Sequence, residues 1–241
     1  MKAQVSEPTF LEINNYLQAL ANSEIAQHSQ RFFKTAKGEY GFGDIFLGIR
    51  VPIIRQAVKK FKTASLQTTT ELLQSPYHEI RLFALLQLVQ AFNHGDKAQQ
   101  ETIYQLYLQH TQFINNWDLV DSSAHKIVGA YLLESDRAPL YNLAKSDLLW
   151  ERRIAIIATF AFVDNKQFDD SLIIAEILLN DEEDLIHKAV GWVLREVGKK
   201  DQEVEESFLK QHYQTMPRTM LRYAIEKFDE PLRKAYLKGD V

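Results

Sequence analysis

The chain of 241 residues contains no cysteine. This absence excludes disulfide bonds, thiolate nucleophiles and cysteine metal sites, and it fits a reducing compartment. The polar N-terminal stretch Met1–Glu7 leads into no apolar segment of the kind that forms a signal peptide, so we expect a cytoplasmic protein. The longest apolar run, Ile154–Val163 with Thr159 inside it, is too short to cross a bilayer. We therefore expect no membrane partner.

Glycine and proline are scarce, at 9 and 6 residues, and they lie mostly between periodic segments, as a helical protein requires. The alternation of apolar and polar residues that is typical of strands is not sustained anywhere. The 7 histidines are scattered without the spacing of metal ligands, so we expect neither a metal site nor a cofactor. These absences favour an all-α protein.

Apolar residues instead recur every three to four positions in several windows. The window Ile80–Val89 is apolar nearly all round, which predicts a helix buried between two layers. We predict similar buried helices over Trp150–Val163 and Leu185–Val197, with the more amphipathic helices Glu101–Phe113 and Ser171–Leu179 between and before them.

These helices also repeat. A basic residue closely followed by alanine recurs at Arg153, Lys188 and Arg222, at intervals of 35 and 34 residues. A period in this range is typical of helical pairs that stack to bury one continuous core. We expect an all-α, HEAT-like helical-repeat solenoid that forms a single domain over residues 1–241 and is a monomer. The inner helices of such a solenoid line a concave groove, and the three cations would face it.

The net charge of −4 argues against a nucleic-acid partner, but the charge is unevenly distributed. The stretch Ile45–Thr70 contains five basic residues and no acidic one, and Leu185–Lys200 is also basic. A basic groove would bind a phosphate backbone, whereas the alternative is that these residues form ordinary solvated helix faces. The candidate phosphate contacts are Arg50, Arg55, Lys59, Lys188, Arg195 and Arg222.

Two tryptophan-containing segments carry the most specific pattern. Trp117 and Asp121 are four residues apart, so a helix would place the indole and the carboxylate on one face. Trp192 is followed by Arg195 and Glu196 at the same helical spacing. Two helices that each present an aromatic ring beside a charge could hold a cationic sugar or base between them. The alternative for each indole is packing in the core.

At these residues the chain resembles the AlkD-like family of DNA alkylation-repair glycosylases, which are built from HEAT-like repeats. The resemblance covers most of the chain, and the second and fourth of its segments are specific. The four segments are Phe46–Pro52, Asn116–Asp121, Trp150–Ala155 and Lys188–Glu196. The resemblance implies an activity that hydrolyses the N-glycosidic bond of N3- or N7-alkylated purines in duplex DNA.

The resemblance also implies the site residues. The catalytic cleft of the family uses two tryptophans, an aspartate and an arginine, which fall on Trp117, Asp121, Arg153 and Trp192. The family places a tyrosine from its N-terminal region near the lesion, and Tyr40 is the candidate here. The DNA would lie in an open channel with the damaged base left in the helical stack. No lysine is placed as a Schiff-base nucleophile, so we expect hydrolysis without strand cleavage.

The proposed chemistry suits these residue types. A purine alkylated at N3 or N7 is already cationic and leaves as a neutral base, so the enzyme must mainly stabilise positive charge on the sugar and supply a water. Asp121 would do both. Trp117 and Trp192 would present electron-rich faces, each contributing roughly 0.5–2 kcal/mol toward a cationic group, and Arg153 would bind a phosphate.

Other interpretations remain open from the sequence. Asp121 would otherwise be a surface acid or a helix cap, and Arg153 would otherwise pair with an acid of a neighbouring repeat. For the whole chain, the alternatives are a non-catalytic HEAT protein that binds DNA structures and a HEAT-type scaffold for protein interactions. The first would be expected to lack a tryptophan or the aspartate, and the second would bind through its acidic segments.

Overall fold

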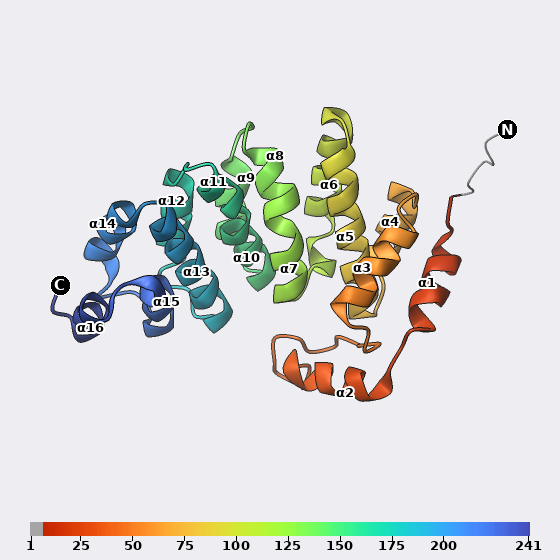
Figure 1. Ribbon diagram of the computed structural model, residues 1–241, viewed down its shortest axis with the longest axis horizontal. Coiled ribbons are helices and arrows are strands. Elements are labelled where there is room, and N and C mark those ends of the chain that lie inside the picture. Colours follow the sequence, from red (N-terminus) through yellow and green to blue (C-terminus); the bar gives the residue numbers. More distant parts are fainter. Residues whose placement is uncertain (1–6) are drawn as a thin grey trace. The chain divides into compact units, whose positions relative to one another are not determined.

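The computed structural model describes residues 7–241, and this part of the chain is all-α, as the sequence predicts (Figure 1). It contains no strand, although an isolated parallel bridge joins Ile45 to Tyr77. No helix among these residues is long and apolar enough to span a membrane. The chain divides into two compact units, Met1–Ser123 and Ala124–Val241, and each has its own buried apolar residues. That the whole chain forms one domain stays a prediction.

The first unit is formed by seven α-helices and one short 3-10 helix within the described residues. They are α1 (Phe10–Gln18), α2 (Ser23–Phe32), α3 (Val51–Lys60), α4 (Leu66–Leu73), α5 (His78–His94), α6 (Lys97–Gln109), η1 (Thr111–Phe113) and α7 (Trp117–Ala124).

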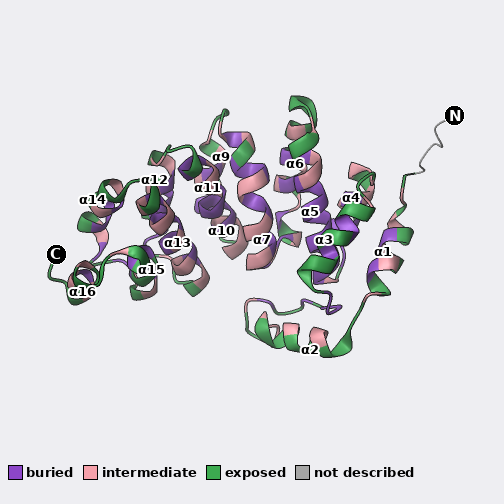
Figure 2. Cartoon of the chain, viewed as in Figure 1, coloured by how far each residue is buried: buried purple, intermediate pink, exposed green. Residues whose placement is uncertain are grey.

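Helix α5 forms the core of the first unit. All of its residues from His78 to Val89 are buried, and the helix packs against α3, α4 and α6 (Figure 2). The prediction of a helix that is apolar nearly all round over Ile80–Val89 is therefore confirmed. Burial on every side follows from this sequence, because no face of the window is polar enough to remain in water.

Helix α2 has no buried residue, so it is not held by the apolar core as α5 is. Its N-cap, Asn22, donates its backbone N–H to the carbonyl of Leu47 at 2.8 Å. Gly48 lies against the same end with φ of +80°, and a Cβ at this position would come within 2.1 Å of the Asn22 carbonyl oxygen. Position 48 therefore requires glycine both for its backbone conformation and for this close approach.

A buried carboxylate fixes the segment that leads into α3. Glu79, on α5, accepts hydrogen bonds from the backbone N–H groups of three successive residues. The N···O distances are 2.8 Å for Leu47, 2.7 Å for Gly48 and 3.2 Å for Ile49. These backbone donors lie outside regular secondary structure, so the carboxylate satisfies groups that burial would otherwise leave unpaired.

The second unit continues the chain from a five-residue π-helix. Its helices are η2 (His125–Gly129), α8 (Ala130–Leu132), α9 (Ala138–Ala144), α10 (Leu149–Ala158), α11 (Phe160–Asp164), α12 (Asp169–Ile177), α13 (Asp184–Lys200), α14 (Gln202–His212), α15 (Arg218–Ala224), η3 (Ile225–Lys227) and α16 (Glu230–Lys238).

Helix α13 is central to the second unit and packs against α10, α12, α14 and α15. The predicted helix over Leu185–Val197 is confirmed, whereas the one over Trp150–Val163 is two helices, α10 and α11. The break falls at Thr159, whose buried hydroxyl donates to the carbonyl of Ile156 at 2.7 Å. A threonine that bonds its own turn in this way competes with the regular helical hydrogen bonds.

Candidate functional site

The first residue of α7 is held by a buried asparagine. Asn116 is fully buried, and its carbonyl accepts the first helical hydrogen bond, from Val120. Its side-chain oxygen accepts from the backbone N–H of Trp117 at 2.8 Å, while its amide donates to Asp44 at 3.2 Å. The start of α7, and with it Trp117, is therefore fixed by hydrogen bonds within the first unit.

The indole of Trp117 lies in an aromatic cluster rather than in the apolar core. Trp117 is partly exposed, and its ring stacks on Phe33 with centroids 5.2 Å apart. Phe32 approaches edge-on at 6.0 Å. The indole N–H donates to the hydroxyl of Tyr40 at 3.3 Å. Residues at and after the end of α2 thus determine the orientation of the Trp117 ring.

Asp121 lies one turn after Trp117 on α7 and is also partly exposed. It interacts with other residues of the chain. Burial raises the pKa of the Tyr107 phenol and the nearby negative charge of Asp121 raises it further, whereas the hydrogen bond with Ser123 opposes both. The structure therefore places the indole and the carboxylate on one helix, at the spacing that the sequence analysis singled out.

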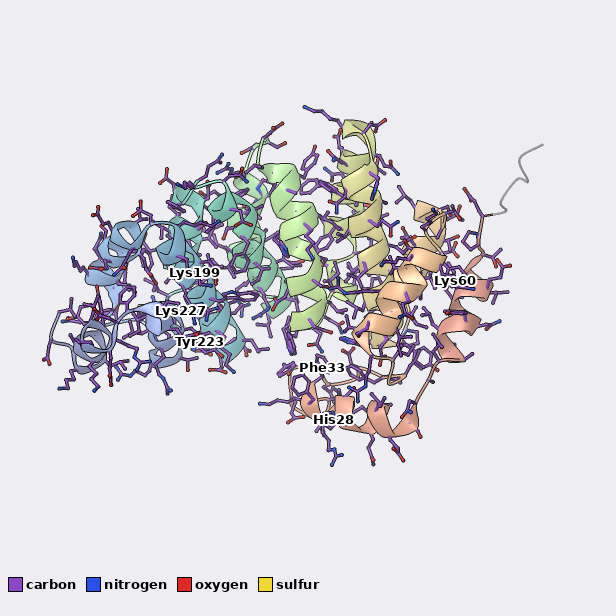
Figure 3. All side chains as sticks on the ribbon, in the orientation of Figure 1. His28, Phe33, Lys60, Lys199, Tyr223 and Lys227 are labelled. Carbon is purple, nitrogen blue, oxygen red and sulfur yellow. The ribbon has the colours of Figure 1, made fainter. Side chains whose placement is uncertain are left out.

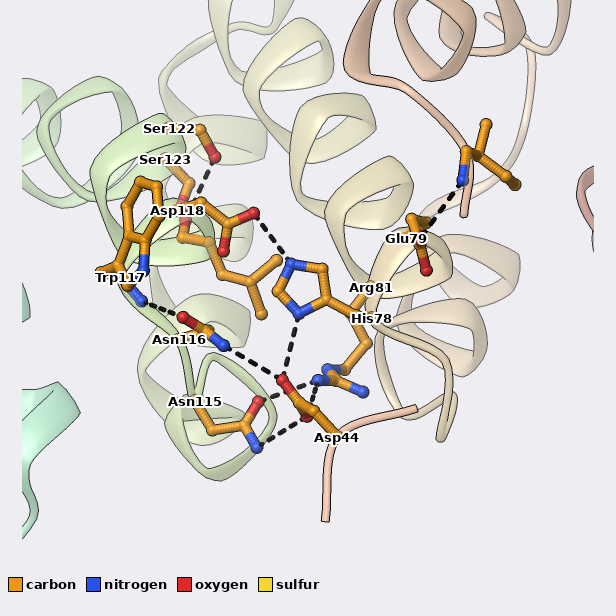
Figure 4. Close-up of polar contacts among 12 residues, drawn as sticks. Asp44, His78, Glu79, Arg81, Asn115, Asn116, Trp117, Asp118, Ser122 and Ser123 are labelled. Carbon is orange, nitrogen blue, oxygen red and sulfur yellow. Dashed lines mark hydrogen bonds and ion pairs between the residues drawn. The ribbon is translucent and has the colours of Figure 1, made fainter. Parts of the chain in front are cut away.

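A buried network of charged side chains supports this end of α7 (Figure 4). His78, on α5, contacts Asp44 through Nδ1 at 3.1 Å and Asp118 through Nε2 at 2.8 Å. Arg81 also binds Asp44, with 2.5 Å between Nη2 and Oδ1. Asn115 bridges this pair by accepting from Arg81 and donating to Asp44. These contacts join the loop at residue 44, α5 and α7.

The two aspartates keep His78 protonated. Burial alone would lower the pKa of His78, but the negative charges and hydrogen bonds of Asp118 and Asp44 raise it to about 9. Burial would raise the pKa of Asp44, but the hydrogen bond and charge of His78 and the guanidinium of Arg81 lower it overall. Near neutral pH the network therefore contains an imidazolium that donates from both ring nitrogens.

A cavity of about 650 Å³ lies beside this network, with α2 along one side. His28 and Phe33, labelled in Figure 3, line it together with Arg50, His78 and Asp118. The Oδ1 atom of Asp118 is buried and has no hydrogen-bond partner among the described residues. The cavity is therefore lined by aromatic side chains and by both positively and negatively charged side chains.

In the second unit, Trp192 is partly exposed on α13. Its ring lies against Phe160 with centroids 4.8 Å apart. At the preceding residue, Gly191, the backbone of α15 lies close to α13, because a Cβ there would lie 2.4 Å from the carbonyl oxygen of Met220. The position of α13, and with it that of Trp192, is thus fixed by direct backbone packing against α15.

Arg153 is buried in α10, and its guanidinium donates to the backbone carbonyl of Leu185 in the first turn of α13. It has further interactions within the chain. Through the Leu185 carbonyl the residue joins two helices of the second unit. Its role as a phosphate ligand stays a prediction.

The predicted phosphate contacts differ in their surroundings. Arg50, Arg55 and Lys59 are exposed on or just before α3 and form no ion pair with a described residue. Lys188 pairs with Asp184 at 2.7 Å, and Arg195 pairs with Glu226 and Glu196, so these two cations are already partly neutralised. Arg222 is exposed on α15 and, like the three cations of the first unit, forms no ion pair within the described chain.

Each unit therefore holds part of the predicted set. The first contains Trp117 and Asp121 with the cations of α3, and the second contains Arg153 and Trp192 with the remaining basic residues.

Sequence reasoning did not identify Phe33, Asp44, His78 or Asp118. His78 lies 34 residues from Asp44 and 40 from Asp118 along the chain, so no short spacing connects the three. The run Asn116–Asp118 could have drawn attention to Asp118 alone, since polar residues that flank a helix start often cap it. No signal in the sequence points to the other three.

Comparison with known proteins agrees with this architecture. A solved structure described as a predicted DNA alkylation repair enzyme from Enterococcus faecalis superposes with a TM-score of 0.68. It is 18% identical in sequence, and the match covers 87% of this chain and 97% of that one, so it shows the fold alone. No curated protein sequence matches the chain. The family model for DNA alkylation repair enzymes matches residues 13–228, and the chain therefore belongs to the DNA alkylation repair enzyme family.

Proposed function

We propose that this protein is a monofunctional DNA glycosylase that hydrolyses the N-glycosidic bond of cationic N3- or N7-alkylated purines in duplex DNA. One observation carries the proposal: a chain of the DNA alkylation repair enzyme family presents a partly exposed indole, Trp117, and a partly exposed carboxylate, Asp121, one helical turn apart. An aromatic face beside a carboxylate is suited to a site where positive charge develops.

In the proposed reaction the alkylated base leaves as a neutral purine, taking the electrons of the N-glycosidic bond. Positive charge then develops on the deoxyribose. The Asp121 carboxylate stabilises this charge and orients or deprotonates the water that attacks the anomeric carbon. The products are the free base and an intact strand with an abasic site.

The tryptophans act on the sugar and backbone rather than on the base edge. Trp117 would offer its ring from the aromatic cluster with Phe33, and Trp192 would do so from α13. We infer that duplex DNA lies in a concave groove of a HEAT-like repeat and that the lesion stays in the stack. Such a site would accept bulky adducts as well as methyl groups, because no closed pocket must fit the base.

The test is the release of 7-methylguanine from a duplex oligonucleotide under single-turnover conditions. Asp121→Asn keeps the size of the side chain but removes its charge. We expect it to lose about 10²–10⁴-fold in rate, the range for a positioned acid–base group, while its affinity for DNA changes little.

The matched control is Asp147→Asn, which makes the same chemical change at an exposed position outside the proposed site. It should excise the base at the wild-type rate. Full activity in Asp121→Asn would remove this carboxylate from the mechanism. Tight binding to DNA without any release by the wild-type protein would favour the non-catalytic DNA binder instead.

A further inference from the structure

Three arginines surround a cavity in the second unit, and only one of them, Arg222, is among the phosphate contacts predicted from the sequence. The cavity has a volume of about 420 Å³. Arg218 and Arg222 reach it from α15, and Arg233 reaches it from α16. The other residues that line it are Ile225, Glu226 and Leu237.

The three guanidinium groups have no stabilising role that the fold explains. Arg218, Arg222 and Arg233 are exposed, and none forms an ion pair with a described residue. Arg218 and Arg222 are four residues apart on α15, and like charges at this spacing destabilise a helix. The cluster therefore slightly destabilises the helix, and no ion pair with a described residue compensates for it.

The carboxylate in the cavity is already neutralised by other cations. Glu226 pairs with Arg195 of α13, and with Lys227 at 2.9 Å. These hydrogen bonds and charges keep the pKa of Glu226 below its usual range, so it stays ionised but satisfied. The three arginines consequently form a local excess of positive charge in a chain whose net charge is −4.

Several contacts hold helix α15 against α13. Gly191 lets its backbone lie directly against α13. Thr219 and Lys188 both hydrogen-bond to the carboxylate of Asp184, which lowers its pKa. The pair Arg195–Glu226 ties η3, which directly follows α15, to the same helix. Guanidinium groups on a fixed helix lose less entropy when they bind a ligand, which favours a specific anion site.

A second cavity of about 330 Å³ adjoins the first and shares two of its lining residues, Arg222 and Glu226. Its other lining residues are Thr219 and Tyr223, and Tyr223 is labelled in Figure 3 near Lys227. The hydroxyl of Thr219 already donates to the carboxylate of Asp184, so the hydroxyl of Tyr223 is the one left for a ligand. Side-chain hydroxyl groups are common partners of phosphate oxygens in complexes with DNA. The two cavities together therefore offer two neighbouring positions for anions.

We propose that Arg218, Arg222 and Arg233 bind two successive phosphate groups of one DNA strand. Arg222 lies between the two positions and would contact both phosphates. The planar guanidinium suits paired hydrogen bonds to phosphate oxygens. The proposal deepens the proposed function, on which it rests for the identity of the polyanion, and it adds Arg218 and Arg233 to the residues that position the duplex.

The experiment measures the salt dependence of binding to an undamaged duplex. Each phosphate contact contributes about 0.9 to the slope of log Kobs against log salt concentration. Arg233→Gln should reduce the slope by about 0.9, so the advantage of the wild type over the variant should shrink ~3.5-fold between 50 and 200 mM salt. Arg218→Gln should behave in the same way and serves as the second variant.

The matched control is Lys234→Gln, which removes a charge from the next residue of α16, where Lys234 is paired with Glu230. Its slope should equal that of the wild type. Equal slopes for the wild type, Arg233→Gln and Arg218→Gln would overturn the proposal even if the wild type releases 7-methylguanine. A reduced slope in both arginine variants would support it even if no base is released, which would instead refute the glycosylase.

Discussion

The buried imidazolium of His78 makes the stability of this protein depend on pH in a way that can be calculated. The pKa of His78 is about 9 in the folded protein, against about 6.5 for an unperturbed histidine. A folded-state pKa that is raised means that protonation favours folding. This contribution is complete below pH 6.5 and is lost as the pH rises through 9.

The magnitude follows from the difference between the two pKa values. Each pKa unit corresponds to 1.36 kcal/mol, so raising the pH from 6.5 to 9.5 should remove about 3 kcal/mol of unfolding free energy. A contribution of this size is a large part of the total stability of a typical domain. It arises from Asp44 and Asp118, which lose their shared cationic partner when His78 is deprotonated.

The assay is urea unfolding followed by far-ultraviolet circular dichroism at four pH values between 6.5 and 9.5. His78→Gln cannot be protonated, so the stability advantage of the wild type over this variant should shrink by about 3 kcal/mol across the range. His94→Gln is the matched control, because His94 is exposed and bonds only its own helix, at the Gln90 carbonyl. Its profile should run parallel to that of the wild type.

The outcome that refutes the reasoning is a constant difference between the wild type and His78→Gln at all four pH values. This result would mean that the pKa of His78 is the same in the folded and unfolded states, so that Asp44 and Asp118 do not raise it.

Two further changes test the packing of the second unit. Gly191→Ala places a methyl group 2.4 Å from the carbonyl oxygen of Met220, so α13 and α15 must separate, and we expect a loss of ~1–3 kcal/mol in stability, seen as a lower melting temperature; an unchanged melting temperature would contradict this close approach. Burial raises the pKa of Glu205 to about 8, so the wild type loses stability as the pH rises from 4.5 toward 8. Glu205→Gln should therefore gain stability relative to the wild type at pH 8 compared with pH 5 in thermal unfolding, and an equal difference at both pH values would refute a buried, titrating carboxyl.

Much of the fold could be predicted from the sequence because helical periodicity is a local property. The run Ile80–Val89 specifies a helix buried on all sides, and the structure confirms it as part of α5. The boundary at Thr159 could not be predicted, since it depends on a side-chain hydrogen bond that competes with the backbone. Whether the repeats are HEAT-like stays a prediction.

The candidate site divides in the same way. The helical spacing of Trp117 and Asp121 predicts a shared face, and both lie partly exposed on α7. The resemblance offered Tyr40 as a residue near the site, and its hydroxyl accepts a hydrogen bond from the Trp117 indole. The stacking of Phe33 on Trp117 could not be predicted, because Phe33 lies more than eighty residues earlier in the chain. Nor does an arginine in an apolar window reveal its acceptors, one of which for Arg153 is the backbone carbonyl of Leu185.

The carboxylate of Glu79 has a consequence for how substitutions would be tolerated far from its own helix. One side chain accepts hydrogen bonds from three consecutive backbone amides. An uncharged or shorter replacement at position 79 would therefore free the segment Leu47–Ile49 that leads into α3. It would also change the position of Arg50, which follows this segment. Position 79 looks in the sequence like an ordinary acid in the first turn of a helix. The residue is instead constrained because it binds a loop that is distant in the sequence. A substitution at position 79 should therefore be tolerated only together with a matching substitution in the loop at residues 47–49.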